Sequence, residues 1–186
     1  MINLILLKLE EDCLIFNMYK KLNLDFSELD LLLIKGNPNN SYGKTFIEHP
    51  VKHLEYVLNI IRSKIKFNIR PNRINITDIV FPGADPHCDH WPVALNYYFD
   101  ADGHDTTYFY KLKNENEYQH REVKIYNKND LQIIDSFVAN RGDCYLLNTH
   151  IPHAVYMATE NPNRTMLRFT WFDKTFDDVL NSIEII

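Results

Sequence analysis

From residue 73 onward, apolar and polar residues alternate with a period of two, in short runs that are separated by polar stretches. The runs cover residues 73–81, 93–99, 106–112, 122–126, 131–138, 143–148, 154–158 and 165–172. This alternation is typical of strands with one buried face, and residues 100–103 and 140–142 have the composition of turns. Eight short strands with few helices between them predict an antiparallel β-sandwich or barrel.

Before these strands the period changes to that of a helix. Apolar residues recur there at helical spacing: Val51, Leu54, Val57, Leu58, Ile61 and Ile65. Pro50 suits a first helical position, so an amphipathic helix is predicted over about residues 50–66, packed on the outside of the sandwich. A short closing helix is predicted over residues 177–183.

The N-terminal part has weaker patterns. They suggest strands at residues 2–7 and 14–17, a helical turn at 26–31 and a loop at 37–43. A chain of 186 residues with 45% hydrophobic content can form one core but is short for two domains. We therefore expect a single domain over residues 1–186, with 1–70 as a supporting segment and 71–176 as the core.

Charge and cysteine content narrow the class of protein. A net charge of −5 gives no electrostatic footprint for nucleic acid, although a local basic groove would barely change that number. Residues 2–7 are apolar, but no basic stretch precedes them and acidic residues follow at 10–12, which fits neither a signal peptide nor a membrane span. Three widely spaced cysteines indicate no disulfide framework, so the expected location is cytoplasmic, with no membrane partner.

His87 and Asp89 form a His-x-Asp motif, and a histidine pair follows about sixty residues later. In an extended segment the two side chains lie on one side, about 6.6 Å apart along the chain, and Cys88 points to the other side to pack as a small apolar residue. Two histidines and one carboxylate are the ligand set of non-haem Fe(II) oxygenases. A His-x-Asp pair alone is common by chance, so the surrounding sequence has to support the assignment.

The third ligand has two candidates, His150 and His153. Pro152 suits the end of the turn, so His153 would open the next strand and be held rigidly, which favours it as the ligand. His150 would then lie in the turn at the mouth of the pocket.

Arg164 and Arg168 share one face of the last predicted strand, because they are four residues apart. A guanidinium inside a barrel is costly unless an anion meets it, and its fork matches a carboxylate. The alternative is that these arginines face solvent on an edge strand.

Together, these motifs resemble the Fe(II)/2-oxoglutarate-dependent dioxygenases, particularly small members with a prolyl-hydroxylase-like core. The matching segments are residues 86–89 (PHCD), 94–99 (ALNYYF), 106–109 (TTYF), 146–155 (LLNTHIPHAV) and 164–169 (RTMLRF). The resemblance covers about residues 75–172. It implies a double-stranded β-helix, or jelly roll, and an iron ion bound by His87, Asp89 and His153.

The resemblance also implies a binding site for 2-oxoglutarate. A basic residue about ten positions after the distal histidine binds the far carboxylate in this family, a role that Arg164 fits, with Arg168 as the fallback. Tyr98 would share that carboxylate. Asn96 faces the same way as Tyr98 by strand parity and could meet the cosubstrate or the substrate.

The implied reaction couples oxidative decarboxylation of 2-oxoglutarate by O2, which gives succinate, to oxidation of a substrate. The resemblance implies hydroxylation over halogenation, because halogenases of this family lack the carboxylate ligand that Asp89 would supply. Desaturation and cyclisation are the alternatives that stay open. The aromatic content suits a small molecule, a peptide or a nucleobase as substrate, and the sequence sets no oligomeric state. Two departures from the family are the stretch at residues 103–107 and His90, for which a surface position is favoured.

Two other functions compete with this one. A cupin-like metal enzyme could use the same barrel without 2-oxoglutarate, and such sites do not need Arg164. A non-catalytic binding module would make the His-x-Asp motif a coincidence, and fold alone does not separate these possibilities.

Overall fold

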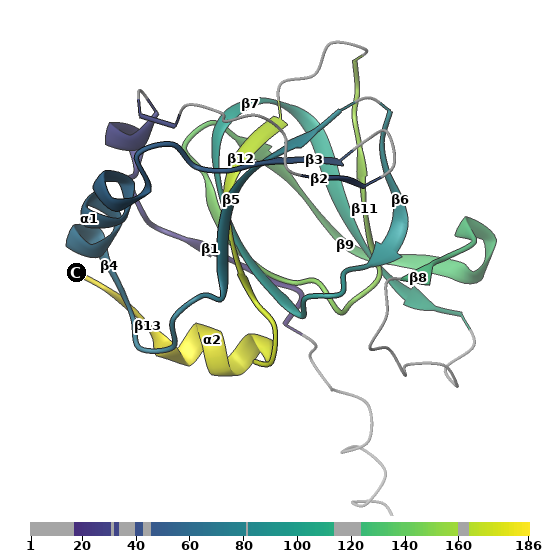
Figure 1. Cartoon of the computed structure of the whole chain (residues 1–186). Helices are drawn as coiled ribbons and strands as arrows, with labels where there is room; N and C mark the ends of the chain where they lie inside the picture. The colour runs from purple at the N-terminus through teal and green to yellow at the C-terminus, as the bar shows by residue number, and fades with distance from the viewer. Residues whose placement is uncertain are drawn as a thin grey trace, which may run out of the picture.

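The computed structural model describes residues 17–30, 32–33, 40–42, 46–80, 82–113, 124–159 and 164–186. These residues form a mainly β jelly roll with two α-helices beside it, as the sequence predicts (Figure 1). The strand predicted at 2–7, most of that at 14–17 and most of the loop at 37–43 lie outside the described residues. Within the described part of the chain, no helix is long and apolar enough to cross a membrane.

The described residues form thirteen strands. They are β1 (Tyr19–Leu22), β2 (Asn40–Tyr42), β3 (Phe46–His49), β4 (Ile65–Phe67), β5 (Arg73–Ile79), β6 (Gly83–Cys88), β7 (Val93–Leu112), β8 (Lys124–Ile125), β9 (Leu131–Asn140), β10 (Cys144–Asn148), β11 (His153–Tyr156), β12 (Arg164–Trp171) and β13 (Ile183–Ile185). The helices are α1 (Leu54–Lys64) and α2 (Phe176–Ser182), and single 3-10 turns cover Ser27–Leu29 and Lys128–Asp130. The turn predicted at 26–31 is thus confirmed as one short turn.

Strand β7 joins the two layers of the roll, and every strand pairing is antiparallel. Its first half lies in the layer β2-β3-β5-β12-β7-β10-β1, and its second half lies in the layer β9-β7-β11-β6-β8. The turn predicted at residues 100–103 is therefore wrong. Ala101 pairs with Arg164 and Asp102 with Asn140, so the strand bends between the layers without breaking.

Helix α1 is shorter at both ends than the predicted 50–66. At the C-terminal end, Ile65–Phe67 forms β4 and pairs with β13, so a strand takes up that end of the apolar pattern. At the N-terminal end, His53 has a φ of +55°, and the helix begins at the next residue, Leu54. Helix α2 begins after Thr175, whose side chain and that of Asp178 form a reciprocal capping box, and it confirms the predicted closing helix.

Two apolar clusters lie on the two faces of the first layer. The outer cluster packs α1 and α2 against the sheet and includes Phe26, Val57, Ile61, Ile76, Tyr97, Leu167, Phe169 and Trp171. The inner cluster fills part of the roll and includes Ile79, Tyr98, Phe109, Phe137, Tyr145, Leu147, Val155 and Met166. Alternate residues of β12 therefore face the helices or the interior of the roll.

Gly83 allows β6 to lie close against β11, a pairing that the sequence pattern did not predict. Its φ is +98°, and a Cβ at this position would lie 2.1 Å from the carbonyl oxygen of Val155. This close approach belongs to the same ladder that sets His87 opposite His153.

We expect Gly83→Ala to lower the free energy of unfolding by about 3 kcal/mol or more, because it adds a backbone clash to an unfavourable φ. Gly142→Ala is the matched control, since Gly142 also has a positive φ but has no heavy atom within 4 Å of the added Cβ. Its expected cost is about 1 kcal/mol. Urea unfolding measures the free energy of unfolding of both variants. If both variants lose the same amount, β6 can move away from β11 at Gly83 without a large cost.

Candidate metal centre

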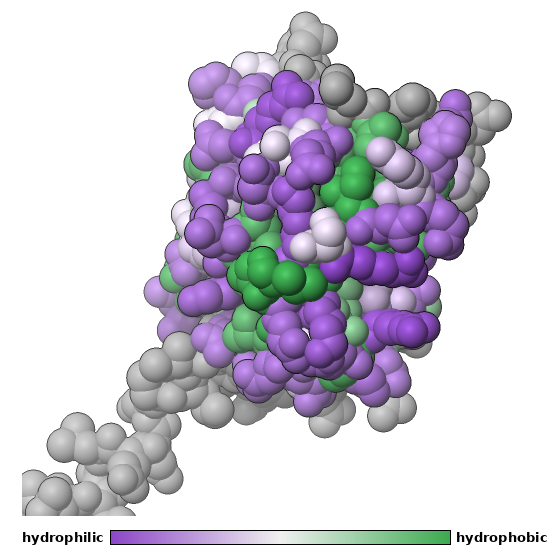
Figure 2. All heavy atoms as spheres, turned by 90° about the vertical axis from the view of Figure 1, so that its left-hand side faces the viewer, coloured by the Kyte–Doolittle hydropathy of each residue, from purple (hydrophilic) through white to green (hydrophobic). Residues whose placement is uncertain are grey.

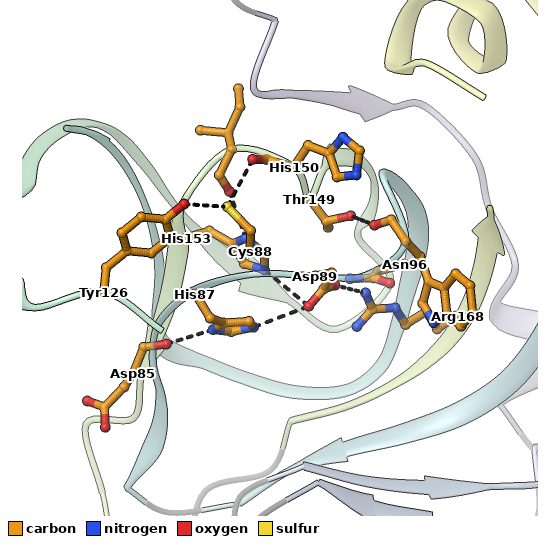
Figure 3. A network of polar contacts seen from close by, with 12 residues as sticks. Asp85, His87, Cys88, Asp89, Asn96, Tyr126, Thr149, His150, His153 and Arg168 are labelled. Carbon is orange, nitrogen blue, oxygen red and sulfur yellow. Dashed lines mark hydrogen bonds and ion pairs between the residues drawn. The ribbon is translucent and has the colours of Figure 1, made fainter. Parts of the chain in front are cut away.

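The structure brings His87, Asp89 and His153 together, although His153 is distant in sequence (Figure 3). One ligand atom from each residue lies within 4.8 Å of the others. Asp89 Oδ1 is 3.3 Å from His87 Nε2 and 4.0 Å from His153 Nε2. Donors at adjacent positions of an octahedral ion lie about 3 Å apart, so small side-chain movements suffice to bind one metal.

Backbone carbonyls fix both imidazoles in the orientation that a metal requires. His87 Nδ1 lies 2.6 Å from the Asp85 carbonyl oxygen, and His153 Nδ1 lies 2.9 Å from that of Ile151. A carbonyl only accepts hydrogen bonds, so each Nδ1 donates and each Nε2 faces the cluster. Such partners hold metal-binding histidines in one tautomer.

The electrostatics of the cluster favour the protonation states of metal ligands at Asp89 and His153. Burial alone would raise the pKa of Asp89, but Arg168 and the two histidines hold it well below its usual range. Burial, with the nearby His87, lowers the pKa of His153 to about 4. Burial would also lower the pKa of His87, but its contacts with Asp89 raise it above the ordinary value. Asp89 is thus ionised and His153 neutral at pH 7.

Cys88 and His150 lie outside the cluster. Cys88 is fully buried on the opposite side of the strand, where its thiol donates to the His150 carbonyl oxygen at 2.9 Å. His150 is exposed in the turn, and its imidazole lies apart from the three side chains (Figure 3). It is not among the residues that line the cavity. His90 is exposed, as expected.

Arg168 contacts the far side of Asp89. Its Nη2 donates to Asp89 Oδ2, and its guanidinium lies 5.4 Å from the ring centre of Phe46. Oδ1 is thereby left as the oxygen that faces both imidazoles. The side chain of Arg168 is buried, so the solvent-facing alternative is wrong for this residue.

Arg164 is also buried, with 2% of its surface exposed, but only neutral groups accept its hydrogen bonds. The acceptors are the Thr107 hydroxyl at 2.6 Å, the Asp105 carbonyl oxygen at 3.2 Å and the Tyr98 hydroxyl at 3.3 Å. Arg164 Nε has no hydrogen-bond partner among the residues that the structure describes. Burial raises the pKa of the Asp105 carboxyl, which accepts from the Ala158 amide and forms no ion pair with Arg164 in the described part of the chain.

A small cavity of about 30 Å³ connects these groups. Its lining includes His87, Asn96, Tyr98, Thr107, Thr149, His153, Arg164 and Arg168. Asn96 and Tyr98 face it from one side of β7, as strand parity predicts, and Asn96 Nδ2 lies 3.4 Å from the Tyr98 hydroxyl. Asn96 Oδ1 is buried and accepts no hydrogen bond from the described part of the chain.

Sequence reasoning gave no role to Thr107 and Thr149. Thr107 supplies the shortest hydrogen bond to Arg164, and its parity with Phe109 on β7 could have placed it inside the roll. Thr149 accepts from the Asp89 amide at 2.9 Å and donates its hydroxyl to the Trp91 carbonyl. Because that contact joins distant segments, no local pattern indicates it.

Several solved structures resemble this fold at low sequence identity. A vicilin from hazelnut (Corylus avellana) is 14% identical, with 75% of this chain and 32% of that chain covered and a TM-score of 0.40. An X-ray structure of E. coli ycfD is 16% identical, with 82% and 49% covered and a TM-score of 0.46. A structure of the Escherichia coli ribosomal oxygenase YcfD is 18% identical, with 72% and 35% covered and a TM-score of 0.39.

This chain therefore spans about a third to a half of the length of the proteins that it resembles. No protein-family model matches the sequence, and no curated protein matches it either. Function therefore has to be inferred from the geometry of the site itself.

Proposed function

We propose that this protein is an Fe(II)- and 2-oxoglutarate-dependent oxygenase that hydroxylates its substrate. The observation that carries the proposal is a buried arginine, Arg164, that has no ion pair among the described residues and lines the same cavity as His87 and His153 of the metal cluster. A buried cation without an ion pair is costly, and a bound carboxylate would remove that cost. Neither a cupin-like site without 2-oxoglutarate nor a binding module needs this arrangement.

The donor set fits a resident Fe(II) ion. His87 Nε2, Asp89 Oδ1 and His153 Nε2 would hold it, which leaves other positions open for ligands. Arg168 would keep Asp89 bound through one oxygen, because its guanidinium occupies Oδ2. When bound, the metal and 2-oxoglutarate supply the oxidation, in which O2 converts 2-oxoglutarate to succinate and CO2 and hydroxylates the substrate.

The protein's own groups would bind and orient the cosubstrate. Arg164 would bind its far carboxylate through the guanidinium fork, with the Tyr98 and Thr107 hydroxyls beside it. Asn96 Oδ1 and Arg164 Nε, both buried and unpartnered, are further groups that a polar ligand would satisfy. The cavity of about 30 Å³ is smaller than a dicarboxylate, so its lining side chains must move on binding.

The first test is an anaerobic titration of the purified protein with Fe(II), with and without 2-oxoglutarate. A visible metal-to-ligand charge-transfer band is expected only when both are present, because the band requires chelation of iron by the keto acid. Succinate formed in air is the second readout. Iron binding without the band would favour a cupin-like site, and no iron binding would favour a binding module.

A further inference from the structure

A second cavity lies outside the roll, between α1 and the first layer. Its volume is about 470 Å³, within the range of pockets that bind small molecules. It is lined by Leu58, Ile61, Arg62, Ile65, Lys66, Phe67, Arg70, Pro71, Ile74, Phe169 and Ile186. The cavity is open to solvent, so it is a groove on the surface and not an internal void.

The walls of this cavity are mostly apolar. Phe169 on β12 and Ile74 on β5 are paired neighbours beneath the cavity, while Leu58 and Ile61 come from α1. Phe169 and Ile61 are buried, so the partly exposed Leu58 and Ile74 are nearer to the opening. Phe67 packs against Phe169 with ring centres 5.6 Å apart. Figure 2 shows this side of the molecule, where apolar atoms reach the surface in the middle of a hydrophilic surround. Such walls suit a hydrocarbon chain or ring.

Every charged side chain that lines the cavity is a cation, although the protein has a net charge of −5. Lys66 pairs with Glu184 at 3.0 Å, and both side chains are more than half exposed. Arg62 lies 3.9 Å from Glu55 and donates to Asn59. Arg70 makes no ion pair or hydrogen bond with the residues that the structure describes. A positive rim over an apolar floor matches a negatively charged head on an apolar body.

We propose that this cavity binds an amphipathic anion, namely a single carboxylate on a medium-length hydrocarbon chain. The arginine forks suit a carboxylate, and the concave shape suits one soluble molecule more than a membrane surface. The site is separate from the metal centre. Arg168 and Phe169 are adjacent on β12 but face opposite sides of the layer, so this proposal does not depend on the proposed oxygenase activity.

The test is isothermal titration of the full chain with decanoate below its micelle concentration. Decyltrimethylammonium controls for the charge of the head, and butyrate controls for the length of the tail. Saturable binding of decanoate, with at least tenfold weaker binding of both controls, is expected. Equal binding of the cationic and anionic amphiphiles, or no binding of decanoate, would overturn the proposal.

Two variants test whether decanoate binds in this cavity. Arg70→Ala is expected to weaken decanoate binding about tenfold, because it removes one charged hydrogen-bond donor. Lys20→Ala is the control, since Lys20 is exposed and does not line the cavity. Equal effects of the two changes would refute the site, provided that urea unfolding shows both variants folded. Binding to phosphatidylglycerol vesicles without binding of decanoate would make this face a membrane surface and also refute it.

Discussion

His153→Ala is expected to abolish Fe(II) binding and turnover, whereas His150→Ala is expected to leave both near the level of the parent protein. His153 is buried, and its Nε2 lies in the cluster with His87 and Asp89. His150 is exposed, and its side chain takes no part in the cluster. Loss of partners around a metal ligand costs 10–100-fold in affinity, so loss of a ligand itself should cost more than about 100-fold.

Anaerobic Fe(II) titration gives the affinity, and Co(II) absorption spectra report the coordination of the metal without turnover. The two substitutions are a matched pair, because both remove an imidazole from the same short segment. Loss of binding in His150→Ala, with binding kept in His153→Ala, would reverse the ligand assignment. Urea unfolding of both variants controls for loss of structure.

The sequence predicted which residue types form the cluster but not the pairing that assembles it. His87 meets His153 because β6 pairs with β11, and β6 was not predicted. Strand β6 contains polar residues and Pro86, so it shows no alternation of apolar and polar residues. The close approach of Gly83 to Val155 depends on the partner strand, which local sequence does not indicate. By contrast, Pro152 marks the start of β11, so the placement of His153 in a strand follows from local sequence.

The division of the strands into two layers was likewise not predicted, because it too depends on pairing between distant segments. Polar residues around Gly103 are typical of a turn, yet the strand continues there because each side finds a partner in a different layer. Helix α1 loses its predicted C-terminal end to β4 for a similar reason, because Ile65–Phe67 pairs with β13. The local alternation of apolar and polar residues indicates which residues are buried. The ends of these strands and of this helix are set by hydrogen bonds to distant strands, which local sequence does not indicate.

Alternation along β12 correctly placed Arg164 and Arg168 on one face but did not separate their surroundings. Arg168 reaches Asp89, because it lies opposite Asn96 on β7, at the level of the metal cluster. Arg164 lies near the bend of β7, where Tyr98 and Thr107 surround it and no carboxylate pairs with it in the described structure. This difference predicts different defects when each arginine is removed.

We expect Arg164→Ala to weaken 2-oxoglutarate binding about 100-fold or more and to leave Fe(II) affinity nearly unchanged. Two hydrogen bonds between a guanidinium and a carboxylate would be lost, each worth about 1.5–3 kcal/mol. Arg164→Lys should restore part of the affinity, because it returns the charge without the fork. Arg168→Ala should instead weaken Fe(II) binding about 10–100-fold, because Asp89 loses the group that orients it.

Weaker 2-oxoglutarate binding can be distinguished from weaker Fe(II) binding by an anaerobic titration with 2-oxoglutarate at saturating Fe(II), in which the charge-transfer band is followed. Under that condition Arg168→Ala should bind 2-oxoglutarate much as the parent protein does, and Arg164→Ala should require far higher concentrations. The reverse result would make Arg168 the anchor. A similar loss in both variants would mean that the arginines bind the cosubstrate together, in which case the contact between Arg168 and Asp89 must open when 2-oxoglutarate binds.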